Sequence, residues 1–255
     1  MKLPLRLFFL PLFFISLSLQ ATDVQREQRW IDQTIDSILD GEPVFLNADD
    51  HRFFSIYTPS ESASANGAII LHGTGFHPDY EQVVQPLRVD LTTHGWNTLS
   101  IQLPLLDAEA DYEDYVSVYP EVPPRIDAAI QYLQTQGSSN LVIVAHSQGA
   151  TMASYFIANS KHQLRALVAI GMSAQHLQPE INSAESLKKI DIPVLDLFGS
   201  KDFPAVLRTA EQRADAGAHN PGYSQQVIAG AYHFFDFRED ELLAAVSDWL
   251  QAFAE

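Results

Sequence analysis

Residues 141–151 read LVIVAHSQGAT and place one serine, Ser147, between a short apolar run and a helix-like run of small residues. This pattern predicts a buried strand that ends at the serine and turns sharply into a helix. Such a turn exposes the serine hydroxyl at the end of the strand and has room only for small neighbours, a requirement that Gly149 meets. Ala145 stands where glycine is usual, so we expect the turn to accommodate one additional methyl group.

Apolar runs alternate with longer helix-like segments from residue 67 onward, which predicts one α/β domain with a mostly parallel, twisted sheet and helices on both faces. The expected strands are residues 68–71, 98–103, 141–145, 167–170, 194–198 and 226–228, and the expected helices are residues 80–94, 124–136, 148–159, 204–216 and 239–254. An amphipathic helix over 23–39 and an antiparallel hairpin of 44–46 with 53–57 precede them. Residues 173–190 are long enough for a small flap and too short for a large lid.

The composition is that of one packed globular domain: 255 residues, 46% of them hydrophobic and 18% charged. The sequence has no cysteine, which excludes disulfides, a lipid-modified N-terminal cysteine, a thiolate metal site and a cysteine nucleophile. The formal net charge is −17 at pH 7. So acidic a surface repels nucleic acid and anionic membranes, and we expect neither as a partner.

The first residues have the layout of a secretory signal peptide. Lys2 and Arg6 precede an apolar run over 7–19, and small residues lead to Ala21 before the polar residues begin. The apolar run is shorter than the roughly 18 residues expected of a spanning helix, so an uncleaved membrane anchor is the less favoured alternative. We therefore expect a signal peptide over residues 1–21, cleavage near Ala21, a mature domain over 22–255 without a membrane span, and a periplasmic or secreted location.

A serine hydroxyl is a weak nucleophile unless a base takes its proton and an acid orients that base. His233 follows the last expected strand, and Asp202 follows the strand 194–198, so both are predicted at the carboxyl edge of the sheet together with Ser147. Asp196, inside an apolar strand, and Asp236, three residues after His233, compete with Asp202 for the role of the acid. Asp202 is favoured because loops at strand ends reach such a site, whereas side chains in mid-strand point into the layers.

The order Ser, Asp, His and the turn at Ser147 resemble the α/β-hydrolase superfamily, and the likeness covers about residues 44–255. The sequence Leu-His-Gly-Thr-Gly at 71–75 is similar to the His-Gly loop of that superfamily. The resemblance implies that the backbone N–H groups of Thr74 and Gln148 form an oxyanion hole.

A more specific likeness is to a group of exported bacterial α/β-hydrolase-like proteins without assigned function. It rests on the stretch from Leu71-His72-Gly73 through His77-Pro78, on Pro86-Leu87-Arg88 and His94-Gly95-Trp96, and on residues 100–104, Ser-Ile-Gln-Leu-Pro. The departure from the superfamily pattern at Ala145 is mild, since an Ala-His-Ser start also occurs in some small secreted lipases of the superfamily. This likeness implies the fold and the export, and it implies no substrate.

Other chemistry-bearing residues have simpler interpretations. His146 is expected to pack or to face substrate, because neighbours on a sharp turn point apart. His72 and His77 are expected to stabilise their loop; a zinc site built from them and an acid is a minor alternative, since the helical His pair is missing. The acidic run 107–115 is expected to be a solvated loop, with recognition of a cationic or polyol substrate, or calcium binding, as its alternatives.

The sequence thus predicts an exported serine hydrolase that cleaves an ester, thioester or amide of a small-molecule acyl substrate through an acyl-enzyme on Ser147. His233 would be the base and Asp202 its orienting acid, with no cofactor and no metal. The alternatives are a non-catalytic binding protein of the cell envelope with the same fold, and an acyltransferase.

Overall fold

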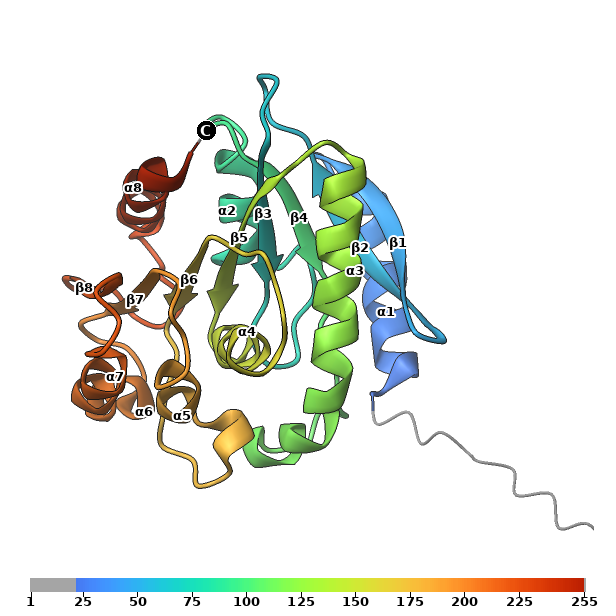
Figure 1. Cartoon of the computed structure of the whole chain (residues 1–255). Coiled ribbons are helices and arrows are strands. Elements are labelled where there is room, and N and C mark those ends of the chain that lie inside the picture. Colours follow the sequence, from blue (N-terminus) through green and yellow to red (C-terminus); the bar gives the residue numbers. More distant parts are fainter. Residues whose placement is uncertain (1–21, 255) are drawn as a thin grey trace, which may run out of the picture.

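The sheet of the protein is eight-stranded and mostly parallel, as predicted (Figure 1). The computed structural model describes residues 22–254, and the predicted signal peptide lies outside these described residues. The strands follow the spatial order β1-β2-β4-β3-β5-β6-β7-β8, with β1 and β2 antiparallel to their neighbours and the others parallel. Their bounds are β1 Glu42–Ala48, β2 His51–Thr58, β3 Asn66–Leu71, β4 Asn97–Ile101, β5 Asn140–His146, β6 Ala166–Ile170, β7 Val194–Gly199 and β8 Tyr223–Ile228.

Helices cover both faces of this sheet, and in Figure 1 the two sets lie on opposite sides of it. One face packs against α2 and α8, and the other against α3, α4, α5, α7 and the 3₁₀ helices η2 and η3. Their bounds are α2 Val84–Asp90, α3 Val122–Thr135, α4 Gln148–Asn159, α5 Ser183–Leu187, α7 Ala210–Gly217, α8 Glu239–Leu250, η2 Tyr112–Glu121 and η3 Pro179–Ile181.

Strand β5 explains why the stretch before Ser147 is wholly apolar. Its side chains alternate between the two layers: Leu141 and Ile143 belong to the core beneath α3 and α4, and Val142 and Val144 to the core beneath α2 and α8. A central strand covered on both faces needs apolar residues at every position, so it reads as a continuous hydrophobic run. The same packing fixes where β5 ends and therefore where Ser147 lies.

Several predicted boundaries are wrong. The helix expected over 204–216 is divided into α6 (Pro204–Arg208) and α7 at Thr209, whose hydroxyl donates back to the Ala205 carbonyl and competes with the helical pattern. The helix expected over 80–94 is limited to α2. The hairpin turn is tighter than expected, because Asp49 adopts a positive φ of 51° that closes the chain between β1 and β2.

Helix α1 (Val24–Thr34), which is followed by η1 (Ile35–Ser37), lies beside the antiparallel edge formed by β1 and β2 (Figure 1). Its Glu27 is buried and accepts hydrogen bonds from Arg125 of α3 at 2.7 Å and from His51 of β2 at 2.8 Å. Burial alone would raise the pKa of Glu27, but the bonds from His51 and Arg125 bring that pKa below its usual value. The helix is therefore attached to two core elements through one buried carboxylate.

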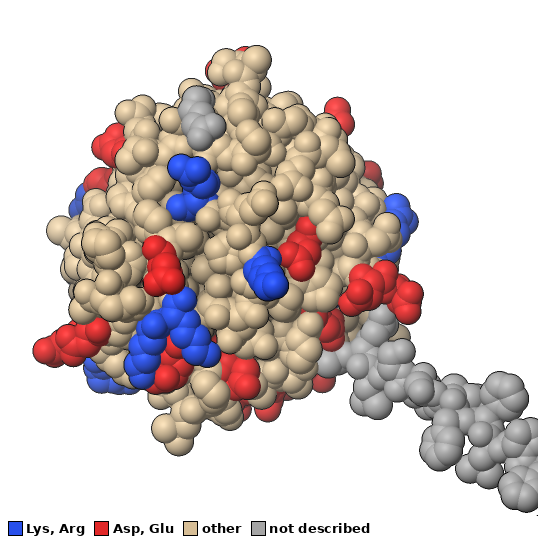
Figure 2. Space-filling model, in the orientation of Figure 1, with Lys and Arg blue, Asp and Glu red and all other residues tan. Residues whose placement is uncertain are grey.

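The surface of the described chain carries both signs of charge. On the face in Figure 2, acidic and basic side chains are interspersed, more densely in the lower half, with uncharged surface between them. A short 3₁₀ helix, η4 (Gln251–Phe253), follows α8. Within residues 22–254, no helix has the length and apolar character needed to cross a bilayer.

The buried carboxylate of α1 gives a test of stability. Glu27→Ala leaves the Arg125 guanidinium in the core without its main counter-charge, and we expect a loss of about 3 kcal/mol in the free energy of unfolding, measured by urea denaturation at pH 7. Because the pKa of Glu27 is lowered in the folded protein, this contribution is present above the ordinary value of 4.5 and is lost as the pH falls through the folded-state pKa.

The matched control is Glu185→Ala, which breaks the exposed ion pair with Lys188. It should cost below about 1 kcal/mol. Equal losses in the two variants would contradict the role assigned to Glu27.

Candidate active site

Ser147 occupies the sharp turn between β5 and α4 that the sequence predicts. Its backbone has φ 56° and ψ −124°, a conformation that L-residues rarely adopt, and its N–H donates to the Ile170 carbonyl at 2.7 Å. Gly149 is required because a Cβ there would lie 2.3 Å from the carbonyl oxygen of His72. The additional methyl group of Ala145 is buried in the core beneath α3 and α4, which accommodates it.

His233 and Asp202 lie beside Ser147 in one continuous chain of hydrogen bonds. The Nε2 of His233 is 2.9 Å from Ser147 Oγ, and its Nδ1 is 2.6 Å from Asp202 Oδ1. Asp202 also accepts hydrogen bonds from the backbone N–H groups of Gly199 and Phe203. Both His233 and Asp202 are almost fully buried, so the carboxylate fixes the ring with Nδ1 protonated and leaves the Nε2 lone pair facing the serine hydroxyl.

The imidazole of His233 also packs closely against the backbone of Gly171, which has a positive φ of 63°. A Cβ on Gly171 would lie 2.9 Å from Cε1 of His233. A larger residue at this position would displace the imidazole, so the residue directly after β6 contributes to the site through the absence of a side chain.

The two competing carboxylates have other partners. Asp196 is fully buried in β7, where it accepts hydrogen bonds from Arg213, Tyr223 and Gln225, each at 2.8 Å. Burial and the neighbouring Asp196 raise the pKa of Tyr223. Asp236 accepts a hydrogen bond from Gln82. Of the three acids considered from sequence, the one hydrogen-bonded to His233 is therefore Asp202, and Asp196 has the structural role of a paired core carboxylate.

The His-Gly loop passes directly beside the nucleophile. A Cβ on Gly73 would lie 3.1 Å from Cβ of Ser147. Within residues 22–254, the backbone N–H groups of Thr74 and Gln148 donate to no other protein group. Gln148 is the first residue of α4, where the helix dipole favours negative charge. The two donors predicted for an oxyanion hole are thus unengaged, one on the residue after Ser147 and the other on the loop that passes beside it.

The His-Gly loop is supported by a neutral histidine, His72, and by helix α1. His72 donates from Nδ1 to the Gly73 carbonyl at 2.8 Å and accepts at Nε2 from the Leu103 N–H at 2.9 Å, and burial lowers its pKa to about 3. With both ring nitrogens engaged, His72 stabilises the loop, as expected. On the other side, Arg26 at 3.2 Å and Trp30 at 3.1 Å donate to the carbonyl oxygen of Gly75.

A family model described as "Protein of unknown function (DUF3530)" matches residues 20–124 and 107–252. The chain belongs to the DUF3530 family. Mouse (Mus musculus) protein ABHD14A is 25% identical over 181 residues, which are 71% of this chain and 68% of that protein.

The solved structures similar to this DUF3530 protein have the α/β-hydrolase fold. The esterase Pf2001 from Pyrococcus furiosus has a TM-score of 0.69 at 16% identity, covering 84% of this chain and 93% of that one. Est1E from Butyrivibrio proteoclasticus has a TM-score of 0.68 at 14% identity, covering 84% of this chain and 98% of that one. The α/β-hydrolase fold predicted from the sequence is thereby confirmed.

His146 has a defined place in this DUF3530 site that sequence reasoning left open. It is fully buried, and its Nε2 donates to the backbone carbonyl of His233 at 3.0 Å. Burial, and to a smaller extent the nearby His233, lower the pKa of His146 to about 3. The residue therefore stays neutral and holds the backbone of His233, which agrees with the expected packing role.

Part of the acidic run is structured. Residues from Tyr112 onward form η2, and Glu113 is 2.8 Å from Nδ1 of His176, a residue of the segment predicted as a flap. The Tyr112 ring stacks on His176 with centroids 4.5 Å apart. Only the first half of the run is the open loop that was expected, and the flap carries no element longer than η3 and α5.

Aromatic side chains next to His233 are the feature that sequence reasoning missed. Phe203, Phe234, Phe76 and Tyr80 form a row of ring contacts beside the base. The Tyr-His-Phe-Phe sequence at 232–235 is the one local signal of it. Its other members are distant in the chain and meet only in the folded protein.

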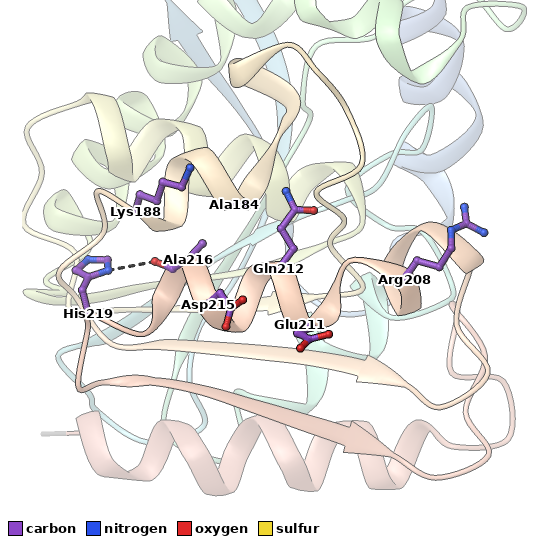
Figure 3. Close-up of a pocket in the computed structure, with 8 residues that line it drawn as sticks. All are labelled: Ala184, Lys188, Arg208, Glu211, Gln212, Asp215, Ala216 and His219. Carbon is purple, nitrogen blue, oxygen red and sulfur yellow. Dashed lines mark hydrogen bonds between the residues drawn. The ribbon is translucent and has the colours of Figure 1, made fainter.

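A separate groove lies away from this site. An open groove of about 730 Å³ lies between α5 and the helices α6 and α7 (Figure 3). Its lining mixes cationic and acidic side chains, so it has no single charge preference, and none of Ser147, His233 and Asp202 borders it. The lining residues are Ala184, Lys188, Arg208, Glu211, Gln212, Asp215, Ala216 and His219.

The backbone conformation of Ser147 predicts that a glycine variant is more stable than an alanine variant. Ser147→Gly and Ser147→Ala both remove the hydroxyl and its contact with His233, but only glycine adopts φ 56° without strain. We expect the glycine variant to exceed the alanine variant by about 1 kcal/mol in the free energy of unfolding, measured by urea denaturation. An alanine variant as stable as the glycine variant would show that the turn is not strained.

Proposed function

We propose that this protein is an exported serine hydrolase that cleaves carboxylic esters, or related thioesters and amides, through an acyl-enzyme on Ser147. The observation that carries the proposal is the hydrogen-bonded chain from Ser147 Oγ through His233 to Asp202, built on a strand, a sharp turn and a helix. The esterases among its structural neighbours agree with a hydrolase function. The signal-peptide layout of residues 1–21 supports action in the periplasm or outside the cell.

In the proposed reaction, Ser147 Oγ attacks the carbonyl carbon while His233 Nε2 takes the hydroxyl proton. The carbonyl oxygen becomes an oxyanion and accepts hydrogen bonds from the N–H groups of Thr74 and Gln148. His233 then gives its proton to the leaving alcohol, and the acyl group stays on the serine. Water, deprotonated by His233, repeats the sequence in reverse and releases the acid. Asp202 holds the imidazolium in place at each step.

A fluorophosphonate probe tests the nucleophile directly. We expect the protein lacking residues 1–21 to be labelled on Ser147, identified by peptide mapping, and Ser147→Ala to lose the label and at least about a thousandfold in kcat/KM for a short-chain ester. The matched control is Ser154→Ala, which changes a serine of the same helix that bonds to the Ala150 carbonyl and should retain the label. An unlabelled wild-type protein would reject the catalytic proposal in favour of a non-catalytic binding protein.

The support of the oxyanion loop by α1 gives a second test. Trp30→Phe removes the Nε1 donor to Gly75 but keeps a ring packed on His77, whose centroid is 4.5 Å away. We expect kcat to fall about tenfold with little change in KM, because a displaced loop weakens transition-state binding. Trp249→Phe is the control, since Trp249 packs on Phe253 at the end of α8. If Trp30→Phe and Trp249→Phe lose stability to the same extent and neither changes kcat, Trp30 has no positioning role.

A further inference from the structure

Phe203 covers one face of the imidazole of His233. The two rings are stacked, with centroids 4.0 Å apart and an angle of 22° between their planes. Phe203 is nevertheless 51% exposed. One face of the phenyl ring is thus occupied by the base, and the other is open to solvent. A single half-exposed phenylalanine is ordinary, but this one lies directly on the base and belongs to a larger apolar surface.

The aromatic surface continues away from Phe203 along the edge of the site. Phe234 meets Phe203 edge to face, with centroids 6.2 Å apart, and meets Phe76 in the same way at 5.9 Å. Phe76 in turn stacks on Tyr80 at 3.7 Å. Phe234, Phe76 and Tyr80 are all partly exposed. We call these four residues, Phe203, Phe234, Phe76 and Tyr80, the aromatic wall.

The reaction geometry decides which half of a substrate meets this wall. The leaving oxygen has to come within about 3 Å of His233 Nε2 to receive its proton. Because Phe203 lies on the His233 ring and Phe234 is 5.1 Å from it, a group attached to that oxygen lies against them. The carbonyl oxygen is directed instead toward Thr74 and Gln148, so the aromatic wall belongs to the alcohol half of the ester.

We propose that the alcohol half of the substrate carries an aromatic or similarly flat apolar group, which stacks on the open face of Phe203. This inference rests on the proposed ester hydrolysis at Ser147. The substrate class is then an ester of an aromatic alcohol with a small acyl group. The wall is built of uncharged rings, which favours such a group over a charged alcohol by the stacking and the apolar area that it buries.

A pair of isomeric esters tests the assignment. Benzyl acetate carries its ring on the alcohol half, and methyl phenylacetate, of the same composition, carries it on the acyl half. We expect the wild-type protein to prefer benzyl acetate in kcat/KM, and Phe203→Ala to lower the ratio of the two kcat/KM values about two- to tenfold, the effect of losing one ring contact. Phe203→Leu, which keeps an apolar side chain without a flat ring, should also lower the ratio.

The control is Phe237→Ala, a change to a phenylalanine of the loop that carries Phe234; Phe237 is 91% exposed and outside the aromatic wall. It should keep the wild-type ratio. If Phe203→Ala lowers kcat/KM for both esters by the same factor, Phe203 serves only to hold His233, and the proposal is overturned.

The two proposals fail in different ways. Absence of fluorophosphonate label on Ser147 would remove the proposed function and this inference with it. A protein that is labelled on Ser147 but does not prefer benzyl acetate over its isomer would overturn the substrate assignment alone.

Discussion

The contact between Gly149 and the carbonyl oxygen of His72 is the constraint on which the site depends. A Cβ on Gly149 would lie 2.3 Å from that oxygen, so α4 can start directly after β5 only because this residue has no side chain. The same contact brings the end of β3 against the start of the helix. It therefore fixes both the unusual backbone of Ser147 and the course of the loop that carries Thr74. One close backbone approach thus aligns the nucleophile with both proposed oxyanion donors.

Buried charges hold the surroundings of this contact in place. Arg213 of α7 pairs with Asp196 of β7, with neither side chain exposed, and also donates to the hydroxyl of Thr209. That hydroxyl accepts from the N–H of Ala174, just after β6. The ion pair thus joins β7, α7 and the segment after β6, which flank the loop of Asp202. Breaking a buried pair costs more than forming it contributes, so such a network specifies one arrangement of these segments.

The sequence alone was sufficient for the layers of the fold and for the neighbours of Ser147. Apolar runs in a doubly covered sheet identify its central strands, and residues just after them necessarily meet at one edge, which is how His233 and Asp202 could be chosen. Helix ends were less predictable, because Thr209 divides a helix through a side-chain bond that depends on its tertiary partners. The aromatic wall could not be predicted, since stacking of Phe203 on His233 depends on where two separate loops fold.

Three imidazoles, those of His72, His146 and His233, lie around the turn at Ser147. Their different surroundings give them different roles. Burial lowers the pKa of both His72 and His146 to about 3, so these two remain neutral at any pH at which the protein is expected to act. A neutral ring offers one donor and one acceptor: His72 uses both within its loop, and His146 uses its donor on the backbone of His233. The framework of the site therefore does not change charge with pH. In the proposed mechanism, proton transfer is thereby confined to His233, the one imidazole of the three that is bonded to both Ser147 Oγ and a carboxylate.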